Sequence, residues 1–320
     1  MTRLAKGFVA LVFQFVCLSA HAAGFLDGKS LNIVIGFAPG GAADAMARVV
    51  AKKVSDNLGQ PVVVVNRPGA GGNIAQQSVV SAAPDGTTIL LGSIGSLTIN
   101  PHLMDFSYDP LKALAPITMG ATYPLVLVVN PGLGVKNLNE FVELAKSKKL
   151  DYASSGVGSA THMAGEMFNH RAGIEMVHIA YKGGGPAMVD LIAGNTAAYY
   201  ASPTSALAHI RNGQLTALAT TGLNRPDILP DIPTIAESGF PGFNAINWYA
   251  FLAPDKTPKT VIDKWNDELV KALNSPDVKE QLEKQGLTPM PGTPQALASF
   301  MQSESEAWAK VIKERNISLQ

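Results

Sequence analysis

The chain has 320 residues, 47% of them hydrophobic, with 25 basic and 25 acidic residues. This length and composition suffice for the cores of one or two domains. The balanced charge argues against nucleic acid as a partner, which would require an excess of positive charge. One cysteine, Cys17, excludes a disulfide framework, and no cluster of residues has the spacing of metal ligands.

The N-terminus predicts a signal peptide over residues 1–22. Arg3 and Lys6 precede an apolar run at 8–18. This run is shorter than the roughly 20 residues that a membrane-spanning helix needs. Ala20-His21-Ala22 then matches a signal peptidase site, so we expect cleavage near Ala22 and export. Removal of two of the 25 basic residues leaves 23 against 25 acidic ones, a formal charge of −2.

Short β-rich runs alternate with helical stretches along the rest of the chain. This order predicts parallel sheets with crossover helices, an α/β fold. Between the first two runs, apolar residues recur at helical spacing from Met46 to Leu58, and Gly59 ends the helix. The expected strands lie at 31–35, 62–65, 88–91, 125–129, 176–179, 215–219 and 247–252.

The distribution of prolines predicts two lobes. A first βαβαβ unit ends near residue 100, and a proline-punctuated segment separates it from a fresh α/β series. A second proline-rich loop leads to the last strand and to the terminal helices, which we expect to cover the first lobe. The predicted ranges are 23–115 for the first part of lobe 1, 116–240 for lobe 2 and 241–320 for the return to lobe 1.

A glycine turn between the first strand and the first helix predicts an anion site, because backbone N–H groups are free where a helix begins. Glycines at this turn let a ligand approach the backbone closely. The alternative is a tight connection in which Asp44 pairs with Arg48. The spacing fits neither common nucleotide motif. The candidate ligand residues are Phe37, Ala38, Pro39, Gly40, Gly41, Ala42 and Asp44.

A second turn, after the strand near residue 151, adds hydroxyl groups that could bind a carboxylate without a counter-charge. The alternative is a serine-rich helix cap, with His162 as a structural or rim residue rather than a base. Its candidate ligand residues are Ser154, Ser155, Gly156, Gly158, Ser159, Thr161 and His162.

Other candidates end strands, where ligands gather in open parallel sheets. Tyr181 and Lys182 begin a third glycine turn, and Lys182 faces either the cleft or solvent. Ser93 and Ser202 follow further strands, and Trp248 could wall a pocket, although core packing is the commoner use of such aromatics. Tyr199 and Tyr249 carry the same two alternatives.

Several of these motifs together resemble the tripartite tricarboxylate transporter receptors, the Bug solute-binding proteins. They are Phe37 to Asp44, Val65 to Gly72, Ala83 to Gly86, Tyr181 to Gly183, Ala193-Gly194 and Pro230 to Thr234. The resemblance implies a two-lobed periplasmic binding protein fold of type II, with a parallel or mixed sheet in each lobe and a ligand cleft between them. In such receptors two loops hold the ligand mainly through backbone and water-mediated contacts.

The resemblance also implies a function. We expect a periplasmic, monomeric receptor without cofactor, metal or catalysis, which binds a small organic acid and delivers it to membrane permease subunits. The acid is a di- or tricarboxylate, an acidic amino acid or an aromatic acid. Two alternatives stay open: a ligand sensor for a signalling partner, and a secreted hydrolase using Ser155 or Ser159 with His162, for which no nucleophile elbow or acid is evident.

Overall fold

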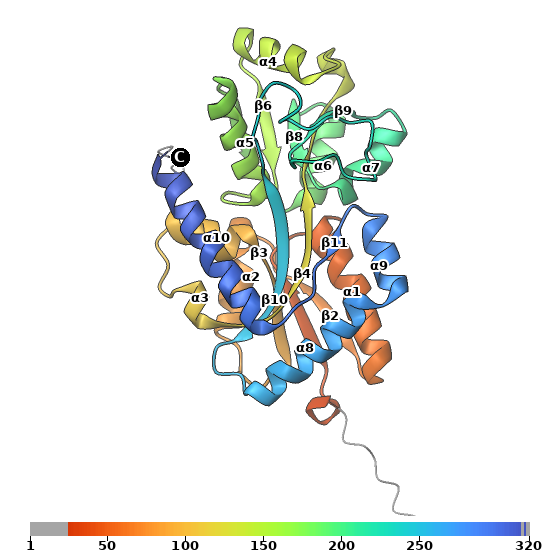
Figure 1. The fold of residues 1–320 in the computed structure, drawn as a ribbon, viewed down its shortest axis with the longest axis vertical. Helices are drawn as coiled ribbons and strands as arrows, with labels where there is room; N and C mark the ends of the chain where they lie inside the picture. Colours follow the sequence, from red (N-terminus) through yellow and green to blue (C-terminus); the bar gives the residue numbers. More distant parts are fainter. Residues whose placement is uncertain (1–24, 315–316, 318–320) are drawn as a thin grey trace, which may run out of the picture.

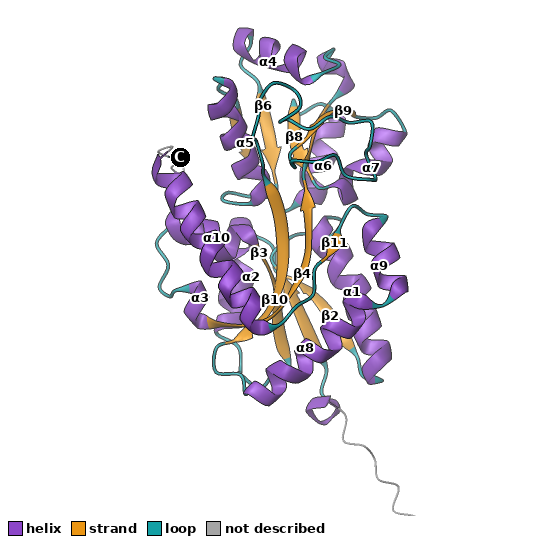
Figure 2. Ribbon diagram, viewed as in Figure 1, coloured by secondary structure: helices purple, strands orange, loops and turns teal. Residues whose placement is uncertain are grey.

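The computed structural model describes residues 25–314 and residue 317, and the predicted signal peptide lies outside them. Two lobes follow one another along the long axis of the molecule (Figure 1). Each lobe has its own β-sheet with helices packed against it (Figure 2). The two-lobed α/β fold expected from the sequence is confirmed.

The first lobe contains a six-stranded mixed sheet. Its strands are β1 (Leu31–Ile35), β2 (Val62–Asn66), β3 (Thr88–Ser93), β4 (Leu114–Pro124), β10 (Ile246–Pro254) and β11 (Thr288–Pro289). They lie in the order β11-β4-β10-β3-β1-β2. β1 pairs in parallel with β2 and β3, whereas β10 runs antiparallel to both β3 and β4. β4 and β11 were not expected from the sequence.

Helices cover both faces of this sheet. They are α1 (Ala42–Leu58), α2 (Asn73–Val80), α3 (Pro110–Ala113), α8 (Lys259–Asn274), α9 (Pro276–Glu283) and α10 (Pro294–Glu314). Met46, Val50 and Val54 on α1 share one apolar cluster with Trp265 of α8. Helices α2 and α10 pack in a second cluster on the opposite face. The helical spacing read from the sequence therefore marks the buried side of α1.

The second lobe has a five-stranded mixed sheet. Its strands are β5 (Val126–Val129), β6 (Asp151–Ser154), β7 (Val177–Ala180), β8 (Ala198–Ala201) and β9 (Thr216–Thr220), in the order β7-β6-β8-β5-β9. β6 is parallel to β7 and β8, and β5 is antiparallel to β8 and β9. Its helices are α4 (Leu138–Ser147), α5 (Ala160–Ala172), α6 (Gly184–Ala193) and α7 (Pro203–Arg211).

Short helical turns complete the chain. One of them, the π-helical turn Gly95–Ile99, directly follows β3 and is fully buried. The others are Phe25–Gly28, Ala70–Gly72, Asn100–His102 and Pro131–Leu133.

The chain crosses between the lobes twice, and the two crossings are bonded to each other. Leu125, between β4 and β5, donates its N–H to the Thr221 hydroxyl at 2.8 Å, and the Thr221 N–H returns to the Leu125 carbonyl at 2.9 Å. Strand β4 pairs in the first sheet along its length to Pro124. We therefore propose lobe boundaries at residue 125 and within 221–245, in place of the approximate 116 and 240.

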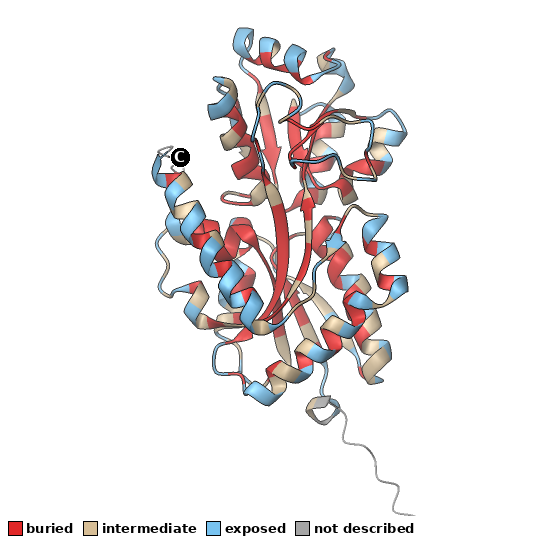
Figure 3. Ribbon diagram, viewed as in Figure 1, coloured by how far each residue is buried: buried red, intermediate tan, exposed pale blue. Residues whose placement is uncertain are grey.

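Burial follows the two sheets, with buried strands at the centre of each lobe and exposed helix faces outside (Figure 3). None of the helices in the described part of the chain is long and apolar enough to cross a membrane.

Candidate functional site

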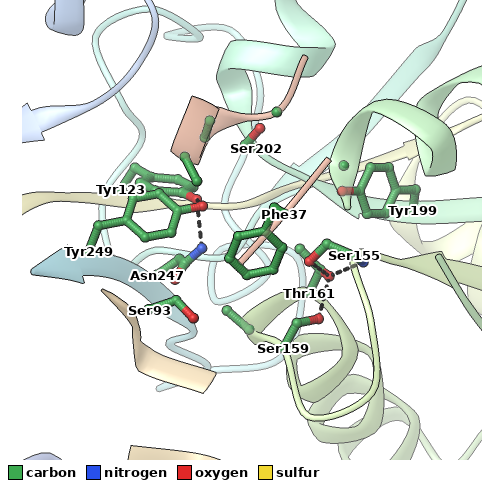
Figure 4. Close-up of a pocket in the computed structure, with 15 residues that line it drawn as sticks. Phe37, Ser93, Tyr123, Ser155, Ser159, Thr161, Tyr199, Ser202, Asn247 and Tyr249 are labelled. Atoms are coloured by element: carbon green, nitrogen blue, oxygen red, sulfur yellow. Dashed lines mark hydrogen bonds between the residues drawn. The ribbon is translucent and has the colours of Figure 1, made fainter. Parts of the chain in front are cut away.

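A cavity lies between the lobes, where the loops after β1, β6 and β8 meet (Figure 4). Its volume is about 20 Å³, roughly the room that one or two water molecules need. No charged side chain is among the fifteen residues that line it. These residues are Phe37, Gly41, Ala42, Ala43, Ser93, Tyr123, Ser155, Ser159, Ala160, Thr161, Gly184, Tyr199, Ser202, Asn247 and Tyr249.

Four helices begin at the wall of this cavity. α1 starts at Ala42 in the first lobe, and α5, α6 and α7 start at Ala160, Gly184 and Pro203 in the second. The residue at or just before each start lines the cavity. Helix N-termini present free N–H groups and a partial positive charge. The uncharged wall therefore has a positive potential that suits an anion.

The capping of these helices leaves N–H groups available. α1 is preceded by Gly41 and α6 by Gly183, and neither residue has a side chain that could cap the helix. In contrast, Ser159 caps α5 by accepting from the backbone N–H of His162, and Ser202 caps α7. The first turns of α1 and α6 are thus the places where a ligand oxygen can accept backbone hydrogen bonds.

Asp44 lies beside the first turn but forms part of an ion pair. Its carboxylate accepts from Arg48 at 2.8 and 3.0 Å and from the Asn66 amide at 3.0 Å. Burial raises the pKa of Asp44, but the hydrogen bonds from Arg48, Asn66 and the Gly40 N–H outweigh it and hold the pKa below its usual value. Because Arg48 compensates the negative charge of Asp44, this carboxylate does not prevent an anion from binding in the cavity.

Three hydroxyl groups of the second turn form one cluster. Thr161 lies at its centre, with its oxygen 3.1 Å from the Ser155 hydroxyl and 2.9 Å from the Ser159 hydroxyl. The Ser155 N–H also donates to the Thr161 hydroxyl at 2.8 Å. Figure 4 shows the cluster beside Phe37. Hydroxyl groups can rotate to donate or accept, so the cluster can adapt to a ligand oxygen.

His162 lies behind this turn. Its Nδ1 accepts the N–H of Gly158 at 3.1 Å, and its ring stacks on His178 at 3.8 Å between centroids. Burial, and then His178, lowers the pKa of His162 to about 3. The hydroxyls of Ser155 and Ser159 bond to Thr161 instead of this ring. This arrangement lacks the serine-to-imidazole hydrogen bond of a hydrolytic triad.

Two tyrosines and an amide form the wall on the first lobe. The Tyr123 hydroxyl donates to the Tyr249 hydroxyl at 2.7 Å, and Asn247 Nδ2 donates to Tyr123 at 2.6 Å. Burial raises the pKa of Tyr249 to about 12 and that of Tyr123 well above its usual value. Both phenols therefore remain neutral hydrogen-bond donors at physiological pH.

The structure brings eight of the predicted residues to the cavity and leaves eleven away from it. Trp248 lies on the other face of β10 and donates from Nε1 to Glu304 at 3.0 Å. Tyr181 donates to Asp190, and Ser154 bonds to His178. At the wall are Phe37, Gly41, Ala42, Ser93, Ser155, Ser159, Thr161 and Ser202. Away from it are Ala38, Pro39, Gly40, Asp44, Ser154, Gly156, Gly158, His162, Tyr181, Lys182 and Trp248.

Seven wall residues were not among the predicted ligand residues: Ala43, Tyr123, Ala160, Gly184, Tyr199, Asn247 and Tyr249. The sequence did signal Tyr199 and Tyr249 as aromatics at strand ends. Strand alternation gives a further signal, because Asn247 and Tyr249 must face opposite to Trp248. Within the described part of the chain, no group of three His, Cys, Asp or Glu residues could hold a metal ion.

Comparison with known proteins places this architecture among solute receptors. The model of the tripartite tricarboxylate transporter family receptor matches residues 46–317. The structure of the periplasmic binding protein BugD is 33% identical, covers 91% of this chain and 99% of its own, and has a TM-score of 0.88. Two proteins of Rhodopseudomonas palustris hold acids. Rpa4515 with adipate is 30% identical, with 90% and 98% coverage and a TM-score of 0.87. MatC with malate is 29% identical, with 88% and 98% coverage and a TM-score of 0.84.

Proposed function

The chain belongs to the tripartite tricarboxylate transporter receptor family, and we propose that it binds a small dicarboxylate in the periplasm and delivers it to the membrane subunits of such a transporter. One observation carries the choice of ligand: four helix N-termini converge on a cavity without charged side chains. Both halves of that cavity come from one chain, so a monomer suffices for binding.

The electrostatics favour an anion over a neutral ligand. An anion near one helix N-terminus gains typically about 0.3–1 kcal/mol, and about 2 kcal/mol in a partly buried geometry. Because the starts of α1 and of α5, α6 and α7 lie in different lobes, a ligand with two carboxylates could engage both at once. The capping hydroxyls and the neutral Tyr249 hydroxyl, which keeps its own hydrogen, supply further donors.

The relatives support the same ligand class. Rpa4515 is described with adipate and MatC with malate, both small dicarboxylates. BugD is described as a periplasmic binding protein, in agreement with the signal peptide predicted at residues 1–22. We extend dicarboxylate binding and the periplasmic location to this chain, because the match to each of the three proteins covers 88% or more of this chain.

Thermal unfolding of the refolded, ligand-free protein tests the proposal. A dicarboxylate should raise the free energy of unfolding by about 2.7 kcal/mol at a hundredfold excess over its dissociation constant. The matching diamide, equal in shape but uncharged, should have little effect. Equal stabilisation by acid and diamide would contradict the anion site, and no stabilisation by any dicarboxylate from four to six carbons would contradict the proposed function.

A further inference from the structure

Two buried polar atoms on the cavity wall have no hydrogen-bond partner among the described residues. They are the Ser93 hydroxyl oxygen and Asn247 Oδ1, and their residues are only 4% and 5% exposed. Most buried polar side-chain atoms are paired, so each exception requires an explanation. A ligand group that bonds to these atoms would explain both.

The sheet places the two atoms at one corner of the cavity. Ser93, the last residue of β3, lies directly opposite Tyr249 in the antiparallel pair with β10. Asn247 lies two residues before Tyr249 on the same strand, and therefore on the same face of the sheet. Figure 4 shows Ser93 and Asn247 next to each other on the side of Phe37 that is remote from Ser155 and Thr161.

The hydrogen bonds around this corner decide which chemical group fits it. Asn247 uses Nδ2 to donate to Tyr123, so its Oδ1 remains as an acceptor. Tyr123 donates to Tyr249, so the Tyr249 hydroxyl keeps its own hydrogen to donate. Ser93 can donate or accept. The corner therefore suits a group that donates one hydrogen bond and accepts another, which is the property of a hydroxyl group.

We propose that Ser93 and Asn247 form a hydroxyl subsite, and that the ligand is a dicarboxylate with a hydroxyl substituent on its carbon chain. This inference rests on the proposed function. A methylene group at the same place would leave Ser93 and Asn247 unpaired. An ammonium group would find no acidic side chain on the cavity wall, and a buried cation without a counter-charge is costly. The relatives leave the choice open, because malate has a hydroxyl group and adipate has none.

Isothermal titration calorimetry with a matched ligand set tests the subsite. Succinate, malate and aspartate share one skeleton and differ only in a hydrogen, a hydroxyl or an ammonium group at one carbon. We expect the better malate enantiomer to bind at least about tenfold more tightly than succinate and aspartate, since a site built for a hydroxyl group discriminates against its absence. The corresponding five-carbon set, glutarate, 2-hydroxyglutarate and glutamate, covers a longer ligand.

Variants connect that preference to the two residues. Ser93→Ala should lower the affinity for the hydroxy acid by about tenfold and leave the affinity for the plain diacid nearly unchanged. Asn247→Leu also removes the hydrogen bond to Tyr123, so it should lower both affinities, with the hydroxy acid losing about tenfold more than the plain diacid. Ser155→Ala is the matched control, because Ser155 lines the opposite side of the cavity. It should leave the ratio of the two affinities unchanged. Ser93→Ala removes one oxygen atom only, so it decides the question if Asn247→Leu fails to fold.

The outcomes separate the subsite from the proposed function. Equal binding of plain and hydroxylated diacids, a preference for the amino diacid, or an unchanged affinity ratio in Ser93→Ala would overturn the hydroxyl subsite while the carboxylate receptor stands. Failure of every diacid in both sets to bind would overturn the receptor proposal for this length class, and the subsite with it.

Discussion

The backbone N–H of Ala38 in the first lobe donates to the carbonyl oxygen of Lys182 in the second lobe at 2.9 Å. The first glycine turn thus bonds directly to the third, which begins at Tyr181, at the rim of the cavity. Glycines allow this approach: a β-carbon added to Gly183 would lie 2.8 Å from the Ala38 nitrogen, and one added to Gly185 would lie 2.6 Å from the Pro39 carbonyl oxygen. The structure therefore represents the closed arrangement of the lobes.

We predict that Gly185→Ala opposes closure without disturbing either lobe. Gly185 lies in the first turn of α6 and outside the left-handed region, so alanine suits its backbone. The added carbon would however meet the rigid Pro39 carbonyl in the closed state. We expect a loss of dicarboxylate affinity of roughly tenfold or more, measured by calorimetry, because a steric clash in one state shifts the equilibrium towards the other.

Gly292→Ala is the matched control for this prediction. Gly292 also lies outside the left-handed region, and an added β-carbon would meet nothing within 4 Å. Its affinity should equal that of the parent protein. If Gly185→Ala retained the parent affinity as well, the closed contact between the Pro39 and Gly185 backbones would have no part in binding.

The small cavity predicts that the lobes open to admit a ligand. A volume of about 20 Å³ with backbone contacts at the rim leaves little space for entry, and hinge closure around a ligand is a common transition in binding proteins. Small-angle scattering should show a larger radius of gyration without ligand. On saturation the radius should decrease towards about 19 Å, the value for a compact chain of this size. An identical radius in both states would indicate a pocket that is permanently closed.

The first glycine turn leads to a charge-specific prediction. Gly41 has extended dihedral angles, φ −98° and ψ 177°, and occupies the N-cap of α1, so Asp and Asn are both acceptable there and favour the helix. The carboxylate of Gly41→Asp would occupy the proposed anion position. We expect its affinity for dicarboxylates to fall at least about a hundredfold, because like charges repel strongly in a partly buried site.

Gly41→Asn separates charge from size in this experiment. The amide has nearly the same shape as the carboxylate and caps the helix in the same way, so its loss of affinity measures the effect of size and capping without the charge and should be much smaller. Circular dichroism of both variants establishes that they fold. Similar losses for Asp and Asn would show that the turn excludes any side chain and would remove the electrostatic argument for this position.

The part of the site that could be predicted from the sequence is the part with local signals. Gly41 and Ala42 are predicted because a strand, a glycine pair and a helix follow each other directly, and Ser159 and Thr161 because hydroxyls gather at one helix start. All four line the candidate cavity. The rule that the carboxyl ends of parallel strands meet places each turn at the edge of its own sheet. It does not bring the two turns together, because β1 and β6 belong to different sheets, and their approach depends on how the lobes face each other.

The remainder depends on contacts between distant segments. Tyr123 and Tyr249 touch only because β4 and β10 pair antiparallel, 126 residues apart in the chain, and β4 itself was not expected. Alternation along the strand shows that Trp248 and Tyr249 face opposite sides of the sheet. It does not show which of the two faces the cavity. The choice is made by α10, whose Glu304 accepts from the indole.

We predict that the stacked pair of His162 and His178 in the second lobe makes the protein less stable in acid. Burial lowers the pKa of His162 to about 3, with a further contribution from His178, and burial lowers the pKa of His178 to about 4. In the unfolded chain both groups titrate near about 6.5. Between these values the unfolded chain binds protons that the folded chain does not, so the free energy of unfolding falls as the pH decreases from about 6.5 to about 4.

Denaturant unfolding at pH 7, 6 and 5 measures this slope. We expect His162 to contribute up to about 1.4 kcal/mol per pH unit, and the less buried His178 a smaller amount. His162→Gln should therefore lessen the dependence on pH, whereas His170→Gln, an exposed residue of the same helix, should leave it unchanged. Since Nδ1 of His162 accepts the Gly158 N–H, protonation would also break a bond that holds the second ligand loop. Ligand affinity should weaken over the same pH range. An equal pH dependence of the free energy of unfolding in His162→Gln and His170→Gln would contradict the assignment to His162.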